Sequence, residues 1–335
     1  MTRSVTAVRE SRPAFELFEG YALASVLASL EMAGVLSDLE DGGMTAAKVA
    51  DRGEDEAALL TASLRYLAHR GMVAEDDAGT FTLTEEGAAV CADRGYLVWL
   101  VGGYGEPLRR LDAFLAHGKR YGVDYPRDGR WVADGAAILG KKDVVPDAMR
   151  LLERLSFDNV LDLGCGNARF LISVCQRFGA GGIGVDLSPA ACAQAEKAVA
   201  EAGLEDRITV VLGDAGDLAG IETIGDVQLV VTFFLLHEIL AGGRDVLVGY
   251  LAGMSKALPP GANLLIAEVE PPTGDGGPDQ PFTPEFTYVH AMMRQVLLGP
   301  DDWSAVLREG GFTVREVLRT TMPGCILLLA ENTGV

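Results

Sequence analysis

The sequence predicts an α/β fold whose C-terminal half is a mostly parallel, doubly wound sheet of seven strands. From about residue 158, apolar runs bounded by turn residues alternate with helical patterns, as they do in buried parallel sheets. Before that point helical patterns dominate, with one short strand pair. The chain has 335 residues, 49% of them hydrophobic, which is enough to bury the core of this sheet and that of a second domain.

The predicted N-terminal domain covers residues 1–95. Apolar residues recur at helical spacing over 14–39, and two further helices with a tight break between them are expected over 45–53 and 55–73. A turn followed by the alternating run "TFTLT" indicates a hairpin over 74–84. Helix, turn, helix and hairpin together form a winged-helix pattern. Because the first helix is apolar over much of its surface, we expect it to pack against a second subunit and form a homodimer.

A winged helix can bind DNA, but this one has the wrong charge. Its second helix opens with Glu54, Asp55 and Glu56, where a DNA-binding helix needs Arg and Lys to meet phosphates. The formal net charge of the chain is −20, which repels phosphate backbones and anionic lipid headgroups. We therefore expect neither a nucleic-acid nor a membrane partner.

Neither targeting signals nor cysteine motifs indicate a function. No apolar run reaches the roughly 18 residues that span a bilayer, and the first residues lack the pattern of a signal peptide. We expect a cytoplasmic protein.

The cysteines show no short paired spacing, so we expect neither a zinc site nor a disulfide framework but reduced packing residues: Cys91, Cys165, Cys175, Cys192 and Cys325.

Residues 96–150 are predicted to connect the two domains and to lie over a pocket. They begin with a helical pattern that glycines interrupt, "YLVWLVGGYGEPLRRLDAFLAHG", and continue with a loop rich in turn formers, "YGVDYPRDGRW". Residues 151–335 form the predicted sheet domain. Its strands are expected in the runs "NVLDLG", "GGIGVDLS", "RITVVLGDA", "DVQLVVTFFLL", "NLLIAEVE", "FTVREVLRT" and "GCILLLAEN", the last two as an antiparallel pair.

A ligand-binding loop is expected after the first of these strands, in "VLDLGCGNARFL". Gly164 and Gly166 let the backbone turn tightly and approach a ligand closely. Asp186 ends the second strand, where a carboxylate can accept hydrogen bonds from both hydroxyls of a ribose. Asp214 follows the third strand and can accept from an adenine amino group.

The loop differs from a dinucleotide-binding GxGxxG and resembles the DxGxGxG motif of class I S-adenosylmethionine-dependent methyltransferases. The motif begins at Asp162, and Ala168 stands in place of its third glycine. The resemblance implies S-adenosylmethionine as cofactor, with its methionine part at the glycine loop, its ribose at Asp186 and its adenine at Asp214. It also implies that three neighbours line the cofactor pocket: Leu187, Ala215 and Phe233.

Two of the four histidines are candidates for the chemistry. His237 is expected to end the fourth strand in "VVTFFLLHEIL", at the carboxyl edge where open sheets bind ligands. In O-methyltransferases that combine a winged-helix dimerisation domain with a methyltransferase domain, a histidine in an "LHD" or "LHE" run is the general base that takes a phenolic proton. His290 lies in "PEFTYVHAMMRQVLL", which follows the fifth strand and returns over the same edge. Two imidazoles facing one cavity can begin a transition-metal site with positions open for water and substrate.

A closer resemblance rests on "FFLLHE", "FTYVHAMM", "VWLVGGYGEPLRR" and "YPRDG". These runs resemble the α-keto acid C-methyltransferases of nonribosomal-peptide biosynthesis, of which the phenylpyruvate type is best known. The resemblance implies one metal ion, iron or else zinc, held by His237 and His290 and chelated by the substrate's carboxylate and 2-oxo group. It implies that Arg127 holds the keto acid and that Trp99 and Tyr104 shape its side-chain pocket.

The chemistry implied is methylation of C3, because a metal that polarises the 2-oxo group lowers the pKa of the C3 proton. Glu238 is interpreted as a contact to substrate or as support behind a ligand, and it stands where the family has aspartate. Tyr104 is bulkier than the family's residue, which favours a smaller aliphatic keto acid such as 4-methyl-2-oxovalerate over phenylpyruvate. The residues do not choose among iron, zinc, cobalt and nickel, nor do they indicate the base or the stereochemistry at C3.

Two other functions compete with this one. A metal-free O-methyltransferase would use His237 as its general base on a phenol or hydroxyl. A transcriptional or scaffolding protein with a vestigial cofactor fold would show a basic recognition helix or a damaged loop. The helix is acidic and the loop residues Asp162, Gly164, Gly166, Asp186 and Asp214 are all present, which disfavours the last function.

Overall fold

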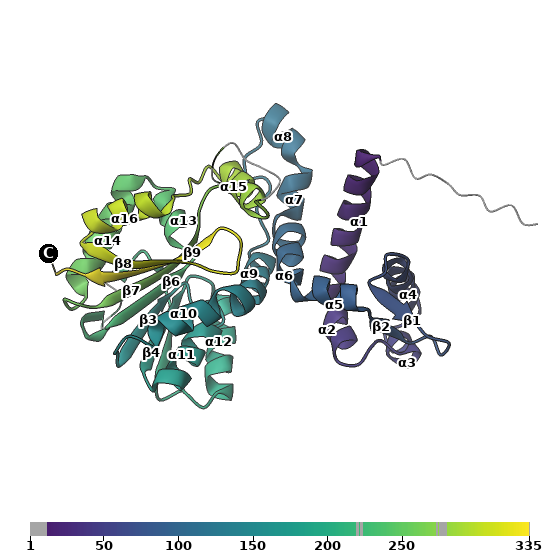
Figure 1. Ribbon diagram of the computed structural model, residues 1–335, viewed down its shortest axis with the longest axis horizontal. Helices are drawn as coiled ribbons and strands as arrows, with labels where there is room; N and C mark the ends of the chain where they lie inside the picture. The colour runs from purple at the N-terminus through teal and green to yellow at the C-terminus, as the bar shows by residue number, and fades with distance from the viewer. Residues whose placement is uncertain (1–11, 219–220, 222–223, 273, 275–279, 335) are drawn as a thin grey trace, which may run out of the picture. The chain divides into compact units, whose positions relative to one another are not determined.

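A computed structural model describes residues 12–218, 221, 224–272, 274 and 280–334. It forms two compact units, which meet in the chain between Leu139 and Gly140, inside helix α9 (Gly129–Asp143; Figure 1). The division of the chain at residues 95 and 150 stays a prediction. No helix among the described residues is long and apolar enough to span a bilayer.

The N-terminal unit consists of short helices and one hairpin. The expected first helix is broken at Gly34, whose φ of 75° is left-handed. The two further helices and the hairpin form where they were expected. The elements are α1 (Pro13–Met32), α2 (Val35–Glu40), α3 (Ala46–Ala50), α4 (Glu54–His69), β1 (Val73–Glu75), β2 (Phe81–Leu83), α5 (Glu85–Ala92), α6 (Arg94–Leu97), the π-helix η1 (Val98–Gly103), α7 (Tyr104–Arg109) and α8 (Leu111–Ala116).

The C-terminal unit contains the predicted α/β sheet. Its seven strands lie in the order β5-β4-β3-β6-β7-β9-β8, parallel from β5 to β7 and antiparallel from β7 to β8. The strands are β3 (Asn159–Leu163), β4 (Gly181–Asp186), β5 (Ile208–Leu212), β6 (Leu229–Phe233), β7 (Asn263–Val269), β8 (Phe312–Arg319) and β9 (Cys325–Asn332). The predicted fold class is therefore confirmed.

Helices cover both faces of this sheet (Figure 1). One face carries α13, α14 and α16, and the opposite face carries α11 and α12. The helices of this unit, with one 3₁₀ turn, are α10 (Val145–Leu152), α11 (Arg169–Phe178), α12 (Pro189–Glu201), η3 (Ile224–Asp226), α13 (Leu236–Leu240), α14 (Arg244–Ala257), α15 (Thr283–Met292) and α16 (Pro300–Glu309).

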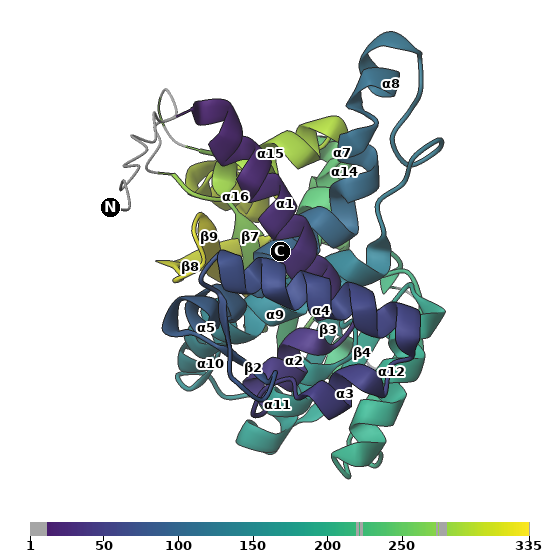
Figure 2. The ribbon, with the colours of Figure 1, turned by 90° about the vertical axis from the view of Figure 1, so that its right-hand side faces the viewer.

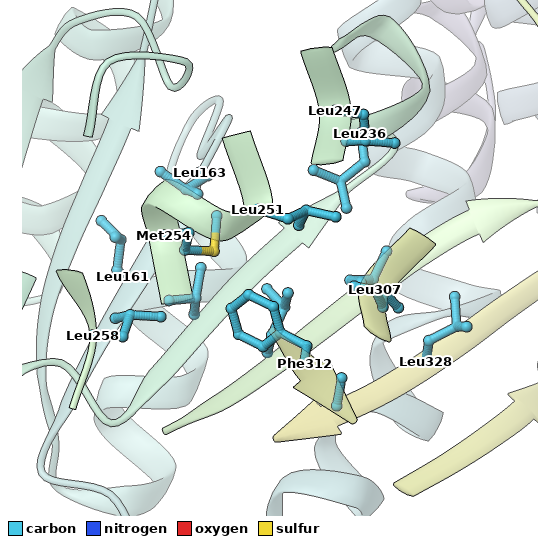
Figure 3. Packing of buried hydrophobic residues seen from close by; sticks show 14 of the residues in the cluster. Leu161, Leu163, Leu236, Leu247, Leu251, Met254, Leu258, Leu307, Phe312 and Leu328 are labelled. Carbon is cyan, nitrogen blue, oxygen red and sulfur yellow. The ribbon is translucent and has the colours of Figure 1, made fainter. Parts of the chain in front are cut away.

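Apolar packing fixes the sheet under these helices. Figure 3 shows Leu161 and Leu163 of β3 in one cluster with Leu251 and Met254 of α14, and Leu307 of α16 belongs to the same cluster. All five side chains have no exposed surface. Burying a side chain of this size contributes about 1.5–3 kcal/mol, so the strands that carry the candidate site form a rigid platform.

Glycines of β4 let a helix approach the opposite face closely. A Cβ on Gly182 would lie 2.8 Å from Cys175 Sγ, and one on Gly184 would lie 2.8 Å from Cys165 Sγ. The "GGIGVD" run therefore keeps α11 and the loop before it tight against the sheet. All five cysteines are buried, as expected of packing residues.

Candidate functional site

The glycine loop turns sharply after β3. Gly164 and Gly166 have φ values of 78° and 54°, and Ala168 is left-handed as well, with φ 55°. The amides of Gly164 and Cys165 donate to the carbonyl of Val185 at 2.8 and 3.0 Å, which ties the loop to β4. Since only glycine adopts this backbone without strain, the first two positions explain why the motif needs glycine. Ala168 bears the strain at the third.

Asp186 connects this loop to the next one. Its Oδ2 accepts a hydrogen bond from the Gly166 amide, and its Oδ1 accepts one from the Ser188 amide, both at 2.9 Å. The carboxylate therefore has a fixed orientation at the end of β4. Asp214 is held in a similar way after β5, because its Oδ1 accepts from the Gly216 amide at 2.8 Å.

The three expected neighbours of these acids differ in their surroundings. Leu187 is 71% exposed beside Asp186, while Ala215 is buried and its carbonyl accepts a hydrogen bond from Tyr250. Phe233 ends β6 and its ring lies 4.8 Å from that of Phe170, centroid to centroid. The cofactor roles of these residues stay predictions.

Asp162 lies within β3, 6% exposed, close behind the loop. Burial raises its pKa to about 7, and the charge of nearby Asp186 adds to the rise. An acid with such a pKa is protonated in the folded chain over much of the range in which it is ionised in the unfolded chain.

His237 lies beyond the strand that was expected to end with it. β6 ends at Phe233, and Phe234 reverses the chain with φ 56° while its amide donates to the Ala267 carbonyl at 2.8 Å. The short helix α13 then begins at Leu236 and carries His237 at its second position. The side chain is buried, with 3% of its surface exposed. The sequence did not reveal this turn, because Phe234 lies inside the continuous apolar run "TFFLL".

Glu268 of β7 holds this histidine and was missed in the sequence. Its Oε2 lies 2.7 Å from His237 Nδ1, and its Oε1 accepts from the His237 amide at 3.2 Å. β6 and β7 are neighbours, with Phe233 opposite Ala267, so the register brings the two residues together. A carboxylate accepts only, so Nδ1 carries the proton and the lone pair of the neutral ring is on Nε2. A charged residue inside an otherwise apolar strand was the available signal.

His290 of α15 meets His237, as the sequence predicted. The two ring centroids lie 4.8 Å apart with the planes at 78°. His290 Nδ1 donates to the Phe286 carbonyl at 2.6 Å, so its Nε2 also carries the lone pair. Both imidazoles are therefore set in the tautomer that a metal ligand or a general base needs.

These two residues fit a transition-metal site in ligand type, tautomer and spacing. A centroid distance of 4.8 Å is compatible with two imidazoles that bind one ion, each at the about 2.1 Å usual for such ligands. Within the part of the chain that the structure describes, no group of three or more His, Cys, Asp and Glu side chains is arranged to hold a metal.

Three other candidate residues come together in the N-terminal unit. The rings of Trp99 and Tyr104 lie 4.7 Å apart, and Arg127 donates to the Tyr104 hydroxyl at 3.3 Å. Trp99 lies in the π-helix η1, against which Gly135 of α9 packs so closely that a Cβ there would lie 2.7 Å from the backbone nitrogen of Trp99. π-Helices are frequent at functional sites. Glu238 follows His237 on α13 and is partly buried.

The raised pKa of Asp162 predicts how stability changes with pH. Its usual value is about 3.9, so between about pH 4 and pH 7 only the folded chain holds this proton, and stability falls as pH rises through that window. Asp162→Asn removes the charge, so the free energy of unfolding of the variant, minus that of the wild type, should increase from pH 5 to pH 8. Urea unfolding of both proteins without cofactor measures this difference. Asp158→Asn, at an exposed acid just before β3, is the matched control, and an equal Asp162→Asn effect at both pH values would contradict the assignment.

Comparisons with known proteins agree with the interpretation of the glycine loop and the sheet as parts of a methyltransferase. Residues 160–261 match the profile of the methyltransferase domain family. The chain is 28% identical to an indolepyruvate C-methyltransferase of Streptomyces griseus over 207 residues, a match that spans 61% of each chain. It is 25% identical to the phenazine O-methyltransferase PhzM of Lysobacter antibioticus over 94% of each chain.

The fold is shared with solved methyltransferases. The structure of the mitomycin 7-O-methyltransferase MmcR superimposes with a TM-score of 0.64 at 17% identity, over 96% of this chain and 97% of that one. The chain therefore has the class I methyltransferase fold and carries a methyltransferase domain of the S-adenosylmethionine-dependent type at residues 160–261.

Proposed function

We propose that this chain is a C-methyltransferase that transfers the methyl group of S-adenosylmethionine to C3 of an α-keto acid. The observation that carries the proposal is the pair of facing imidazoles, His237 and His290, each with Nδ1 bonded and Nε2 carrying its lone pair. The similarity to an indolepyruvate C-methyltransferase supports a keto acid as substrate.

In this proposal His237 and His290 hold one transition-metal ion, iron or zinc. Bound there, the ion would polarise the 2-oxo group and make the C3 proton more acidic. Glu268 keeps the His237 ring in orientation and makes it a better donor, as carboxylates behind metal-bound histidines do. The role proposed for Arg127 rests on the resemblance of "YPRDG" to the keto acid C-methyltransferases: it would bind the carboxylate of the keto acid, since a guanidinium pairs with a carboxylate through two hydrogen bonds.

The methyl transfer is an in-line displacement, so the site has to position the two reactants. The C3–H bond breaks and its proton passes to a base. The electron pair left on C3 forms the new C–CH₃ bond, and the S–CH₃ bond breaks to leave neutral S-adenosylhomocysteine. The glycine loop with Asp186 and Asp214 orients the methyl donor. By the same resemblance, Trp99 and Tyr104 are proposed to limit the size of the keto acid's side chain, and the bulk of Tyr104 favours an aliphatic one.

A metal-free O-methyltransferase is the second candidate, and the His237–Glu268 pair favours it. A histidine whose Nδ1 is bonded to a buried carboxylate is also the arrangement of a general base, with Nε2 taking the proton of a phenol. The similarity to a phenazine O-methyltransferase belongs with this alternative.

The two candidates differ in their response to metal removal. We expect purified protein to contain one metal ion per chain by mass spectrometry and to methylate 2-oxo acids in a reaction that chelators stop. His237→Ala and His290→Ala should each lose metal and lower methyl transfer at least 100-fold, while Glu268→Gln, which removes only the charge behind His237, should lower it about 10–100-fold. Metal-free protein that methylates phenols and ignores chelators would contradict the proposal and support the second candidate.

We also propose that the chain forms a homodimer through α1. The first turns of this helix extend past α2 to α5 within the N-terminal unit (Figures 1 and 2). They carry four large apolar side chains that are more than half exposed: Phe15, Leu17, Phe18 and Tyr21. An exposed patch of this kind marks an interaction surface.

Sedimentation of a Phe18→Glu variant tests this dimer. The wild type should sediment as a dimer of 35.4 kDa chains at micromolar concentration, and the variant as a monomer, because a carboxylate would be buried in the interface. Val246→Glu, at an exposed apolar residue of α14, is the control and should stay dimeric. A wild type that sediments as a monomer would contradict the proposal.

A further inference from the structure

Helix α15 carries an aromatic column that ends on His290. Phe286 and His290 are four residues apart in the helix and therefore lie on the same face, and Phe282, four residues before Phe286, immediately precedes the helix. The rings of Phe282 and Phe286 lie 5.3 Å apart, and that of Phe286 is stacked on the imidazole with a centroid distance of 3.9 Å and an angle of 28°.

Phe286 acts on the imidazole in two ways. Its carbonyl accepts the hydrogen bond from His290 Nδ1 at 2.6 Å, which favours the tautomer with the proton on Nδ1 only while the ring plane keeps Nδ1 aimed at that carbonyl. Its ring lies nearly parallel to the imidazole, which restricts rotation about the last side-chain bond. That torsion is broad for histidine, so without a stacked neighbour the hydrogen bond alone would leave the plane of the ring poorly defined.

The start of the column is built on strained backbone. Phe282 has φ 71° and ψ −44°, and the Thr283 amide donates to the Pro281 carbonyl at 2.9 Å, so Phe282 is the centre of a γ-turn with positive φ. Such a conformation costs a non-glycine residue about 1–3 kcal/mol. Thr283 holds the turn in place, because it packs against Gly324 so tightly that a Cβ there would lie 2.0 Å from its methyl group.

We propose that Phe286, backed by Phe282, is a positioning residue that fixes the plane and tautomer of His290. The proposal rests on the proposed function, in which His290 is a metal ligand, and it adds the residue that orients this ligand. If Phe286 had only a packing role, replacing it would change the stability of the protein but not the tautomer or the ring plane of His290.

The test uses full-length Phe286→Leu, which keeps the backbone carbonyl and removes the stacked ring. Long-range ¹H–¹⁵N NMR of histidine-labelled protein reports the tautomers, and with four histidines the spectrum can be assigned from His→Gln variants. The wild type should show His290 with the proton on Nδ1 alone. Phe286→Leu should show a mixture of tautomers, and Phe286→Tyr, which retains a stacked ring, should restore the wild-type signal.

The second readout is the affinity for Co²⁺ alone, measured by competition with a chelator. It should fall at least tenfold in Phe286→Leu and stay within twofold in Tyr288→Leu, an aromatic-to-leucine change at an exposed position of the same helix. Unchanged His290 tautomer and Co²⁺ affinity in Phe286→Leu would overturn the positioning role, as would equal losses in Tyr288→Leu. A wild type that binds no Co²⁺ would contradict the proposed function, while the tautomers of the metal-free protein would still decide the role of Phe286.

Discussion

The bond between His237 and Glu268 is the interaction on which the candidate site depends. Glu268 is 1% exposed, and a buried carboxylate is costly unless it is paired. Here both of its oxygens bind His237, one through the ring and one through the backbone amide. The pair joins the end of β7 to the first turn of α13, so the same contact orients the ring and ties down the loop after β6. Removing the carboxylate would release both.

Local strain gathers around this site. Four non-glycine residues have positive φ among those that the structure describes: Ala168, Phe234, Phe282 and Arg294. Ala168 and Phe234 lie in the loops that follow β3 and β6, and Phe282 and Arg294 stand at the two ends of α15. The rigid apolar core under the sheet can maintain such conformations because its packing is worth far more than each of them costs.

Much of the fold and part of the site could be predicted from the sequence, for identifiable reasons. Alternating apolar runs and helices are a strong signal, so the sheet could be predicted strand by strand. The meeting of His237 and His290 followed from the rule that the carboxyl ends of parallel strands share one edge. Each of these inferences used a local pattern and a general rule of topology.

The rest depended on backbone detail and on pairs distant in sequence. The break at Gly34 and the reversal at Phe234 depend on single left-handed residues inside apolar runs. Glu268 lies in an apolar run whose pattern does not tell which neighbour its side chain will meet. Phe286 had the helical spacing of an ordinary core residue, and only the stacked geometry distinguishes it.

Hydrogen exchange at C3 of the substrate tests the central claim most directly. The protein would be incubated in D₂O with a 2-oxo acid and with S-adenosylhomocysteine in place of the methyl donor, and deuterium at C3 followed by NMR. The account predicts exchange well above the enzyme-free rate and its loss in His290→Ala, because proton removal from C3 precedes methyl transfer. Exchange no faster than without enzyme, together with methyl transfer to a hydroxyl group, would contradict it.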